Sequence, residues 1–220
     1  MGVTADRTAS LARRYAALVA DSREELTRLD AAVGDADHGE NLDRGMRAVV
    51  EALDADTPDA PAGVLTLVGR TLVSRVGGAS GALYGTAFLR AGKAAGDRAE
   101  LEPADVVAVL EAARDGIAAR GKAKAGDKTM YDAWVPAVEA VSVAVTDGKD
   151  LAGAFASGSA AAERAVKEIV PLVARRGRAS YLGERSAGHR DPGSVSTALL
   201  CRALAEEAQA GCLEAVRIGR

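Results

Sequence analysis

Apolar residues recur at intervals of three and four along most of this chain, which is the spacing of amphipathic α-helices. No run alternates between apolar and polar residues in the way that a half-buried strand requires. About eight helices with short connections favour an all-α fold, an eight-helix antiparallel bundle or barrel. We find no internal repeat and no long linker, and therefore expect a single domain over residues 1–220. The predicted helices cover residues 7–29, 38–53, 64–76, a stretch opened by 77–86 and reaching 95, 103–121, 129–145, 150–174 and 192–216.

Several residues mark where these helices begin, break or end. Ser22, followed three residues later by Glu25, offers a restart within the first helix. Pro103 suits a first helical turn, and Pro171 is expected to kink or end the long alanine-rich helix. The two prolines and three aspartates of residues 54–63 indicate a surface loop.

The polar connections fall after every second helix. In an up-and-down bundle, alternate connections lie at the same end. We therefore expect one shared mouth, formed by residues 30–38, 77–81, 121–129 and 177–193.

The first of these connections carries Asp30, Asp35 and Asp37, together with Gly34 and Gly39. A regular helix turns by about 100° per residue and would scatter carboxylates at these spacings around its axis. They converge only if the backbone is irregular, which the glycines permit. Converging carboxylates repel unless a cation lies among them, and Mg²⁺ prefers oxygen ligands. The loop is therefore a candidate magnesium site.

A purely structural interpretation of the same loop stays open on spacing alone. Asp37 followed three residues later by Glu40 fits a capping box, so that Asp37 would simply start a helix. An EF-hand fits poorly, because Gly39 and Glu40 would stand where that motif needs a side-chain ligand and a glycine.

Two glycine-rich connections are weaker candidates. Residues 77–81 lead into a helix, so their N–H groups could hold phosphate oxygens, with the Ser80 hydroxyl as a further donor, but a tight turn explains them equally well. Residues 121–129 differ from a Walker A motif by one inserted residue, and we regard that as coincidence. A Ser-His-Asp hydrolase using Ser80 with His38 or His189 is a remote alternative.

Composition and charge narrow the function classes. The chain is 48% apolar with a formal charge of −3, which gives no electrostatic footprint for nucleic acid. The basic cluster Arg175, Arg176 and Arg178 is expected to be a solvated helix end. No apolar run is long enough to cross a membrane and no signal-peptide core opens the chain, so a cytoplasmic protein is expected. Cys201 and Cys212 lie about 16 Å apart along one helix, too far for a disulfide, and are interpreted as buried thiols.

The motifs together resemble a known family, the nucleotide-binding L subunit of phosphotransferase-dependent dihydroxyacetone kinase, which is homologous to the C-terminal domain of the ATP-dependent enzymes. The resemblance covers nearly the whole chain. The matching stretches are residues 34–39 with Asn41, Arg44 and Gly45, residues 77–81, residues 120–130, residues 177–185 and residues 191–193. Leu42 stands where the family would have methionine, a change that should affect packing only.

This resemblance implies a nucleotide site at one rim of the helical barrel. It implies that Asp30, Asp35 and Asp37 hold Mg²⁺, with two ions against the phosphates of ADP or ATP. It also implies that Arg178 closes over the nucleotide and assists phosphoryl transfer as the one catalytic side chain. The implied nucleotide contacts are His38, Gly39, Glu40, Asn41, Ala79, Ser80, Gly121, Met130, Arg178, Asp191, Pro192 and Gly193.

The resemblance also implies partners, because the chain contains no recognisable domain for a triose. A separate K subunit would bind dihydroxyacetone, and a phosphohistidine on an M subunit would recharge bound ADP. Exchange of ATP, a kinase subunit for another short ketose such as erythrulose, and a nucleotide-dependent regulatory module that binds a transcription factor are the alternatives. No nucleic-acid or membrane partner is expected.

Overall fold

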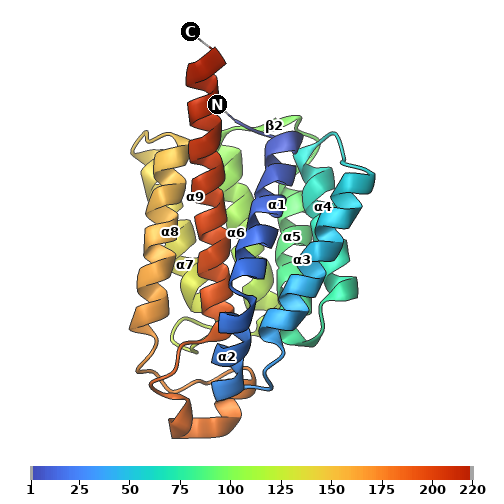
Figure 1. Ribbon diagram of the computed structural model, residues 1–220. Helices are drawn as coiled ribbons and strands as arrows, with labels where there is room; N and C mark the ends of the chain where they lie inside the picture. The colour runs from blue at the N-terminus through green and yellow to red at the C-terminus, as the bar shows by residue number, and fades with distance from the viewer. Residues whose placement is uncertain (1, 219–220) are drawn as a thin grey trace.

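The computed structural model describes residues 2–218, with side chains up to residue 211. Within that range the chain forms a helical barrel with one short strand pair (Figure 1). The elements are β1 (Val3–Thr4), α1 (Ala5–Asp21), α2 (Arg23–Val33), α3 (His38–Ala55), α4 (Pro61–Arg75), α5 (Gly78–Ala95), β2 (Glu100–Leu101), α6 (Pro103–Gly121), α7 (Met130–Thr146), α8 (Leu151–Glu168), the 3-10 helix η1 (Arg178–Ser186) and α9 (Pro192–Ile218).

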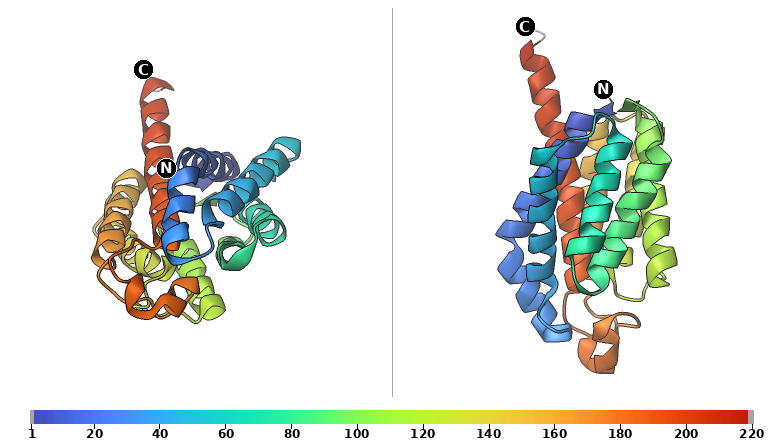
Figure 2. Two further views of the ribbon diagram at one scale, coloured as in Figure 1. Left: turned by 60° about the horizontal axis from the view of Figure 1, so that its bottom comes forward. Right: turned by 90° about the vertical axis from the view of Figure 1, so that its right-hand side faces the viewer.

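The helices close into a ring. From α3 to α9 each α-helix packs against the next along the chain, and α1 packs against both α9 and α3 to complete the circle. Successive helices run up and down (Figures 1 and 2). This arrangement confirms the all-α antiparallel barrel, because α1 and α2 together occupy the place of the first predicted helix.

The first helix is longer than predicted and is broken. α1 ends before Ser22, and α2 continues to Val33. The break at Ser22 was expected, although its side chain makes no capping hydrogen bond. The extension matters for the site, because Asp30 lies in the last turns of α2 and not in the loop after it. Its backbone carbonyl accepts the N–H of Gly34, which closes the helix.

Proline explains two further boundaries. Pro61 occupies the first turn of α4, so this helix begins earlier than predicted, within what was expected to be a loop. Pro103 opens α6 in the same way, as expected. α8 ends at Glu168, before Pro171, so the predicted extension to residue 174 is wrong. A proline also disfavours helical geometry at the residue before it.

Small residues let the helices approach closely. A Cβ on Gly69 would lie 3.0 Å from the carbonyl oxygen of Gly85, and a Cβ on Gly85 would lie 3.0 Å from that of Gly69. α4 and α5 therefore meet backbone to backbone, a contact that larger side chains would prevent. The barrel interior is filled mainly by aliphatic residues, with Tyr15, Tyr84 and Trp134 among them.

The strand pair was not predicted. Val3 pairs with Leu101 and Thr4 with Glu100 in antiparallel register. With two residues in each strand, there is too little sequence to show an alternating pattern. The pair lies at the end of the barrel that carries both chain termini, whereas η1 protrudes at the opposite end (Figures 1 and 2).

Candidate functional site

The four polar connections meet at the end of the barrel that carries η1. They line one cavity of about 430 Å³, a size typical of small-molecule sites. This confirms the shared mouth that the alternation of the loops predicted. The residues that line it are Asp30, Val33, Asp35, Asp37, His38, Gly78, Ala79, Ser80, Ala82, Leu83, Ile117, Arg120, Gly121, Ala123, Thr129, Met130, Arg176, Gly177, Arg178, Ala179, Asp191, Pro192 and Gly193.

Asp30 is the buried anchor of the acidic loop, with 7% of its surface exposed. Its Oδ2 accepts the backbone N–H groups of Asp37 at 2.9 Å and His38 at 3.1 Å. These bonds fold the loop back onto the end of α2. A Cβ on Gly34 would overlap with Oδ1 of the same carboxylate, so glycine is required at that position.

The three carboxylates converge in space. One oxygen from each of Asp30, Asp35 and Asp37 lies within 4.8 Å of the other two. The backbone between them is irregular at Ala36, which has a φ of 62°. Asp37 precedes α3 but makes no side-chain capping bond, so the capping-box interpretation is wrong.

The environment of Asp37 disfavours its negative charge. Burial raises the pKa of this carboxyl, and the neighbouring charges of Asp35 and Asp30 raise it further. A hydrogen bond with Asn41 and the charge of Arg178 act in the opposite direction. Carboxylates held together in this way are suited to a cation, whose charge would remove the repulsion.

His38 is fixed by the barrel interior. Its Nε2 lies 2.9 Å from Oγ of Ser196, which in turn lies 2.8 Å from the Tyr84 hydroxyl. Burial lowers the pKa of His38 to about 4, although the charge of Asp30 acts against this. The imidazole is therefore neutral near pH 7. The Ser80 hydroxyl donates to the carbonyl of Gly77 and not to His38. Ser80 and His38 therefore do not form the catalytic pair of a hydrolase.

The glycine turn before α5 forms the next part of the wall. Gly77 is extended, Gly78 has a φ of +67°, and α5 begins there. A Cβ on Gly81 would overlap with the carbonyl oxygen of Val76, so the turn depends on its glycines. Ala79 and Ser80 lie on the cavity wall in the first turn, where helix N–H groups have no intrahelical partner.

Apolar surface covers the side of the cavity formed by α5, α6 and α7. Gly121 ends α6 beside Leu83, where an added Cβ would lie 3.1 Å from a methyl carbon. Met130 begins α7, and Thr129 and Asp132 cap that helix reciprocally. This side therefore combines an open backbone position at Gly121 with an apolar surface around it.

The N-terminus of α9 closes another side. Oδ2 of Asp191 accepts the N–H of Ser194 at 2.6 Å and so caps the first turn of α9. Burial raises the pKa of Asp191 to about 7; the Ser194 bond opposes that shift, and Asp132 adds to it. Pro192 and Gly193 lie beside it on the wall.

The connection between α8 and α9 covers the cavity from outside. Arg178 lies at the start of η1, and its guanidinium is 2.9 Å from Oδ2 of Asp35. Ala179 packs with Val33 at the end of α2, which holds this segment against the acidic loop.

Three of the predicted nucleotide contacts are not on the cavity wall. Gly39 is buried where α3 crosses α2, and a Cβ there would overlap with the carbonyl oxygen of Arg23. Glu40 is exposed, and its carboxylate lies 3.4 Å from Nε of Arg23. Asn41 is buried, and its Oδ1 accepts from Arg44 at 2.6 Å. The remaining predicted residues line the cavity.

Two arginines on the wall were not assigned from the sequence. Arg176 lies 3.8 Å from Oδ2 of Asp127, and Arg120 comes from the last turn of α6. The basic cluster was interpreted as a solvated helix end, which is wrong because α8 ends at Glu168. Arg176 directly precedes the converging loop of residues 177–193, and this was the signal that could have identified it.

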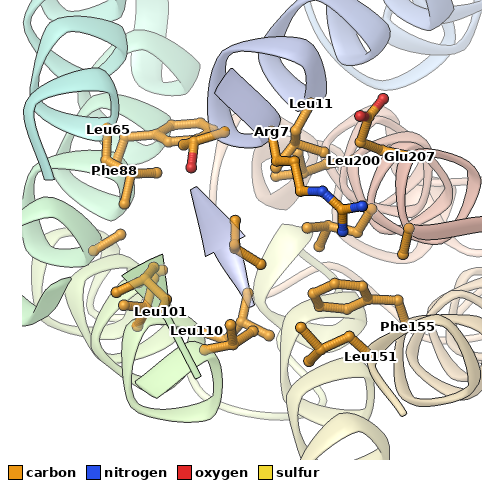
Figure 3. Close-up of a pocket in the computed structure, with 18 of the residues that line it drawn as sticks. Arg7, Leu11, Leu65, Phe88, Leu101, Leu110, Leu151, Phe155, Leu200 and Glu207 are labelled. Carbon is orange, nitrogen blue, oxygen red and sulfur yellow. The ribbon is translucent and has the colours of Figure 1, made fainter. Parts of the chain in front are cut away.

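A second cavity, of about 100 Å³, lies inside the barrel towards the strand pair. Its lining is almost entirely apolar, as the side chains of Leu65, Phe88, Leu110 and Phe155 illustrate (Figure 3). It lacks a cluster of carboxylates or glycine-turn N–H groups. Of these two cavities, the first therefore has the polar lining that a charged ligand would need.

Two further expectations concern the rest of the chain. Cys201 is buried, and burial raises the pKa of its thiol to about 12, whereas the side chain of Cys212 lies outside the described residues. Among residues 2–218, no helix has both the length and the apolar character needed to cross a bilayer.

Comparison with known proteins places the chain in a family. The family model of the DAK2 domain matches residues 32–206. The ADP-binding subunit DhaL of the PEP-dependent dihydroxyacetone kinase of Escherichia coli (strain K12) is 44% identical over 182 residues, which cover 83% of this chain and 87% of that protein. The L-erythrulose 1-kinase of Mycolicibacterium smegmatis is 39% identical over 190 residues, which cover 85% of this chain and 33% of that protein.

A solved structure agrees with these relatives. The crystal structure of the dihydroxyacetone kinase from C. freundii in complex with AMP-PNP and Mg²⁺ matches with a TM-score of 0.66 and 26% sequence identity. The match covers 94% of this chain and 34% of that one. The resemblance indicated by the motifs is thereby confirmed, and the chain belongs to the family defined by the DAK2 domain.

Proposed function

We propose that this chain is the nucleotide-binding subunit of a dihydroxyacetone kinase. In this proposal it holds ADP or ATP with Mg²⁺ and presents the γ-phosphoryl group to dihydroxyacetone bound on a separate K subunit. A phosphohistidine on an M subunit then recharges the bound ADP, in the cytoplasm. The observation that carries the proposal is the convergence of Asp30, Asp35 and Asp37 on one wall of a cavity large enough for a nucleotide.

The acidic loop has the chemistry that a magnesium site needs. Oxygen ligands about 2.1 Å from one Mg²⁺ ion stand roughly 3 to 4 Å apart, and the three carboxylates are already within 4.8 Å of one another. Asp30 is held by two N–H groups, whereas Asp35 and Asp37 are less buried and have room to adjust. Asp30, Asp35 and Asp37 would together hold the two ions that we propose, and the ions would neutralise phosphate charge.

The remaining walls suit the other parts of a nucleotide. The first turns of α5 and α9 place Ala79, Ser80 and Gly193 on the cavity wall, and helix N-termini favour anions. The wall at Gly121 and Met130 offers apolar surface for the adenine ring. His38, Asp191 and Pro192 complete the lining. We propose indirect roles for Gly39, Glu40 and Asn41, through the backbone that positions the acidic loop.

Phosphoryl transfer depends on positioning and on neutralising charge, and it needs no covalent intermediate on this chain. Bound Mg²⁺ would supply charge neutralisation at the phosphate oxygens. Arg178 is the catalytic side chain in this proposal, because its guanidinium lies at the open side of the cavity and can present two parallel donors to a phosphoryl group. The neutral His38 anchors the loop and is not required as a base.

The second candidate is a kinase subunit for a different short ketose, which the likeness to an L-erythrulose 1-kinase favours. A regulatory module that binds a transcription factor is the third candidate function.

Reconstitution with K-type and M-type partner subunits separates the three candidates. Phosphorylation of dihydroxyacetone and of erythrulose is measured with phosphoenolpyruvate or ATP as donor. Turnover of dihydroxyacetone supports the proposal, and turnover of erythrulose alone supports the second candidate. ADP binding without turnover of either ketose indicates the regulator, and failure to bind ADP contradicts all three.

A further inference from the structure

Lys128 is a buried cation that the proposed chemistry does not use. Only 2% of its surface is exposed, and its backbone has a φ of 61°, an unusual conformation for a residue with a long side chain. It lies near the end of the third predicted mouth loop, residues 121–129, one residue before Thr129. Thr129 lines the nucleotide cavity, but Lys128 does not.

The ammonium group of Lys128 is held by three backbone carbonyls. Nζ donates to the carbonyl oxygens of Val170 at 2.8 Å, Leu172 at 2.9 Å and Ser186 at 2.7 Å. An ammonium has three N–H donors, so all of them are used. Burial lowers the pKa of Lys128, and the charge of Asp191 acts against that shift.

All three acceptors belong to the connection between α8 and α9, at its two ends. Val170 and Leu172 follow α8, and Ser186 ends η1. Lys128 therefore closes the base of a loop whose tip carries Arg176 and Arg178 over the cavity. A side chain without N–H donors at this position would leave the Leu172 and Ser186 carbonyls without this partner, whereas the Val170 carbonyl would keep the N–H of Gly188. Carbonyls left without a donor are costly when buried.

Neighbouring bonds reinforce the same closure. The carbonyl of Asp127 accepts the N–H of Arg175 at 3.0 Å, and Oγ of Ser186 accepts the N–H of Ala174 at 2.8 Å. The N–H of Gly188 donates to the carbonyl of Val170 at 2.8 Å. The two ends of the connection between α8 and α9 are thus joined to each other and to the loop that precedes α7.

We propose that Lys128 is a positioning residue that holds residues 170–186 closed over the nucleotide pocket. Its bonds thereby set how long a nucleotide stays bound and keep Arg178 aligned. The part that concerns nucleotide release rests on the proposed function, whereas the closure of the loop does not.

The test compares Lys128→Met, which keeps the length of the side chain but removes its donors, with Lys124→Met, an exposed lysine on the same loop. Release of a fluorescent ADP analogue in Mg²⁺ is measured well below the unfolding temperature of each protein. We expect release at least tenfold faster from Lys128→Met and unchanged from Lys124→Met. Equal release from Lys128→Met and the wild type, even with a lower unfolding temperature, would overturn the inference, because it would leave Lys128 with a purely structural role.

Trypsin provides a second measurement that needs no nucleotide. Arg175, Arg176, Arg178 and Arg185 lie in the closed segment. Cleavage there, identified by mass spectrometry, should be at least tenfold faster in Lys128→Met than in the wild type. Unchanged cleavage overturns the closure itself. If the wild type shows the closure but binds no ADP, the proposed function fails and the closure stands.

If Lys128→Met does not fold, hydrogen exchange of the wild type decides the question. The amides of Ala174, Arg175 and Gly188 should then exchange slowly and become slower still with Mg²⁺ and ADP. Fast exchange at these amides would overturn the inference.

Discussion

The guanidinium of Arg178 lies 2.9 Å from Oδ2 of Asp35, so the proposed catalytic arginine and a proposed metal ligand are paired. Both side chains are partly exposed, and such a pair contributes little to stability. In the proposed function, a metal ion at Asp35 would compete with Arg178 for this carboxylate and would free the guanidinium to contact phosphate. The pair would then couple metal binding to the position of Arg178.

Arg178→Ala should therefore affect transfer more than binding. Removing the arginine frees Asp35, so affinity for Mg²⁺ without nucleotide should stay the same or rise. Phosphoryl transfer in the reconstituted system should fall at least a hundredfold, because a charge-assisted donor is lost. Arg175→Ala, which changes an exposed arginine of the same segment, is the control. Equal losses in affinity and in transfer would contradict a catalytic role for Arg178.

Gly34→Ala should damage the metal site without unfolding the barrel. The new methyl group would overlap with Oδ1 of Asp30 and displace the carboxylate that holds the backbone of Asp37 and His38. We expect at least tenfold weaker Mg²⁺-dependent ADP binding, with the helical circular dichroism signal retained. Unchanged ADP affinity would show that the position of Asp30 is not critical.

Asp37→Asn should abolish Mg²⁺-dependent ADP binding while the helices stay intact. The amide removes a charged ligand, and it also removes a carboxyl whose pKa is raised by burial and by Asp35. The nucleotide-free protein should therefore be no less stable than the wild type. Calorimetry of ADP binding is the measurement, with Asp59→Asn in an exposed loop as control. Equal ADP affinity in Asp37→Asn and the wild type would be inconsistent with the proposed site.

Asp191 should make the stability of the nucleotide-free protein depend on pH. Burial raises the pKa of this carboxyl from its ordinary value of 3.8 to about 7, so the folded state binds the proton more tightly. Its contribution to the free energy of unfolding is fully present below pH 4, is lost as the pH rises to about 7, and is level above that. Denaturant unfolding at pH 4 to 8 measures this loss. The Asp191→Asn variant should lack this part of the pH dependence. Identical profiles of stability against pH in the variant and the wild type would show that Asp191 is not the group responsible.

Helical periodicity was sufficient to predict the barrel, because long segments with apolar residues at intervals of three and four form helices and not strands. The alternation of loops was sufficient to predict the mouth. Two missed boundaries, the start of α4 and the end of α8, lie at or near prolines, whereas the end of α2 depends on tertiary contacts. Asp30 was assigned to a loop because its hydrogen bonds to the N–H groups of Asp37 and His38 cannot be read from spacing.

The acidic and glycine-rich walls of the cavity and Arg178 were predicted, whereas Arg120 and Arg176 were missed. Arg176 lies in a short basic cluster that is typical of a solvated helix end, and only the end of α8 at Glu168 shows otherwise. Lys128 was dismissed with the near match to a Walker A motif. Its three carbonyl partners lie more than 40 residues away along the chain, beyond the range of any local pattern.

Titration of ADP into the wild-type protein with Mg²⁺ and then with EDTA tests the central claim most directly. The proposed site predicts one ADP bound per chain in Mg²⁺ and at least a hundredfold loss of affinity when the metal is removed. Equal affinity under both conditions, or no binding under either, would contradict a metal-dependent nucleotide site at Asp30, Asp35 and Asp37.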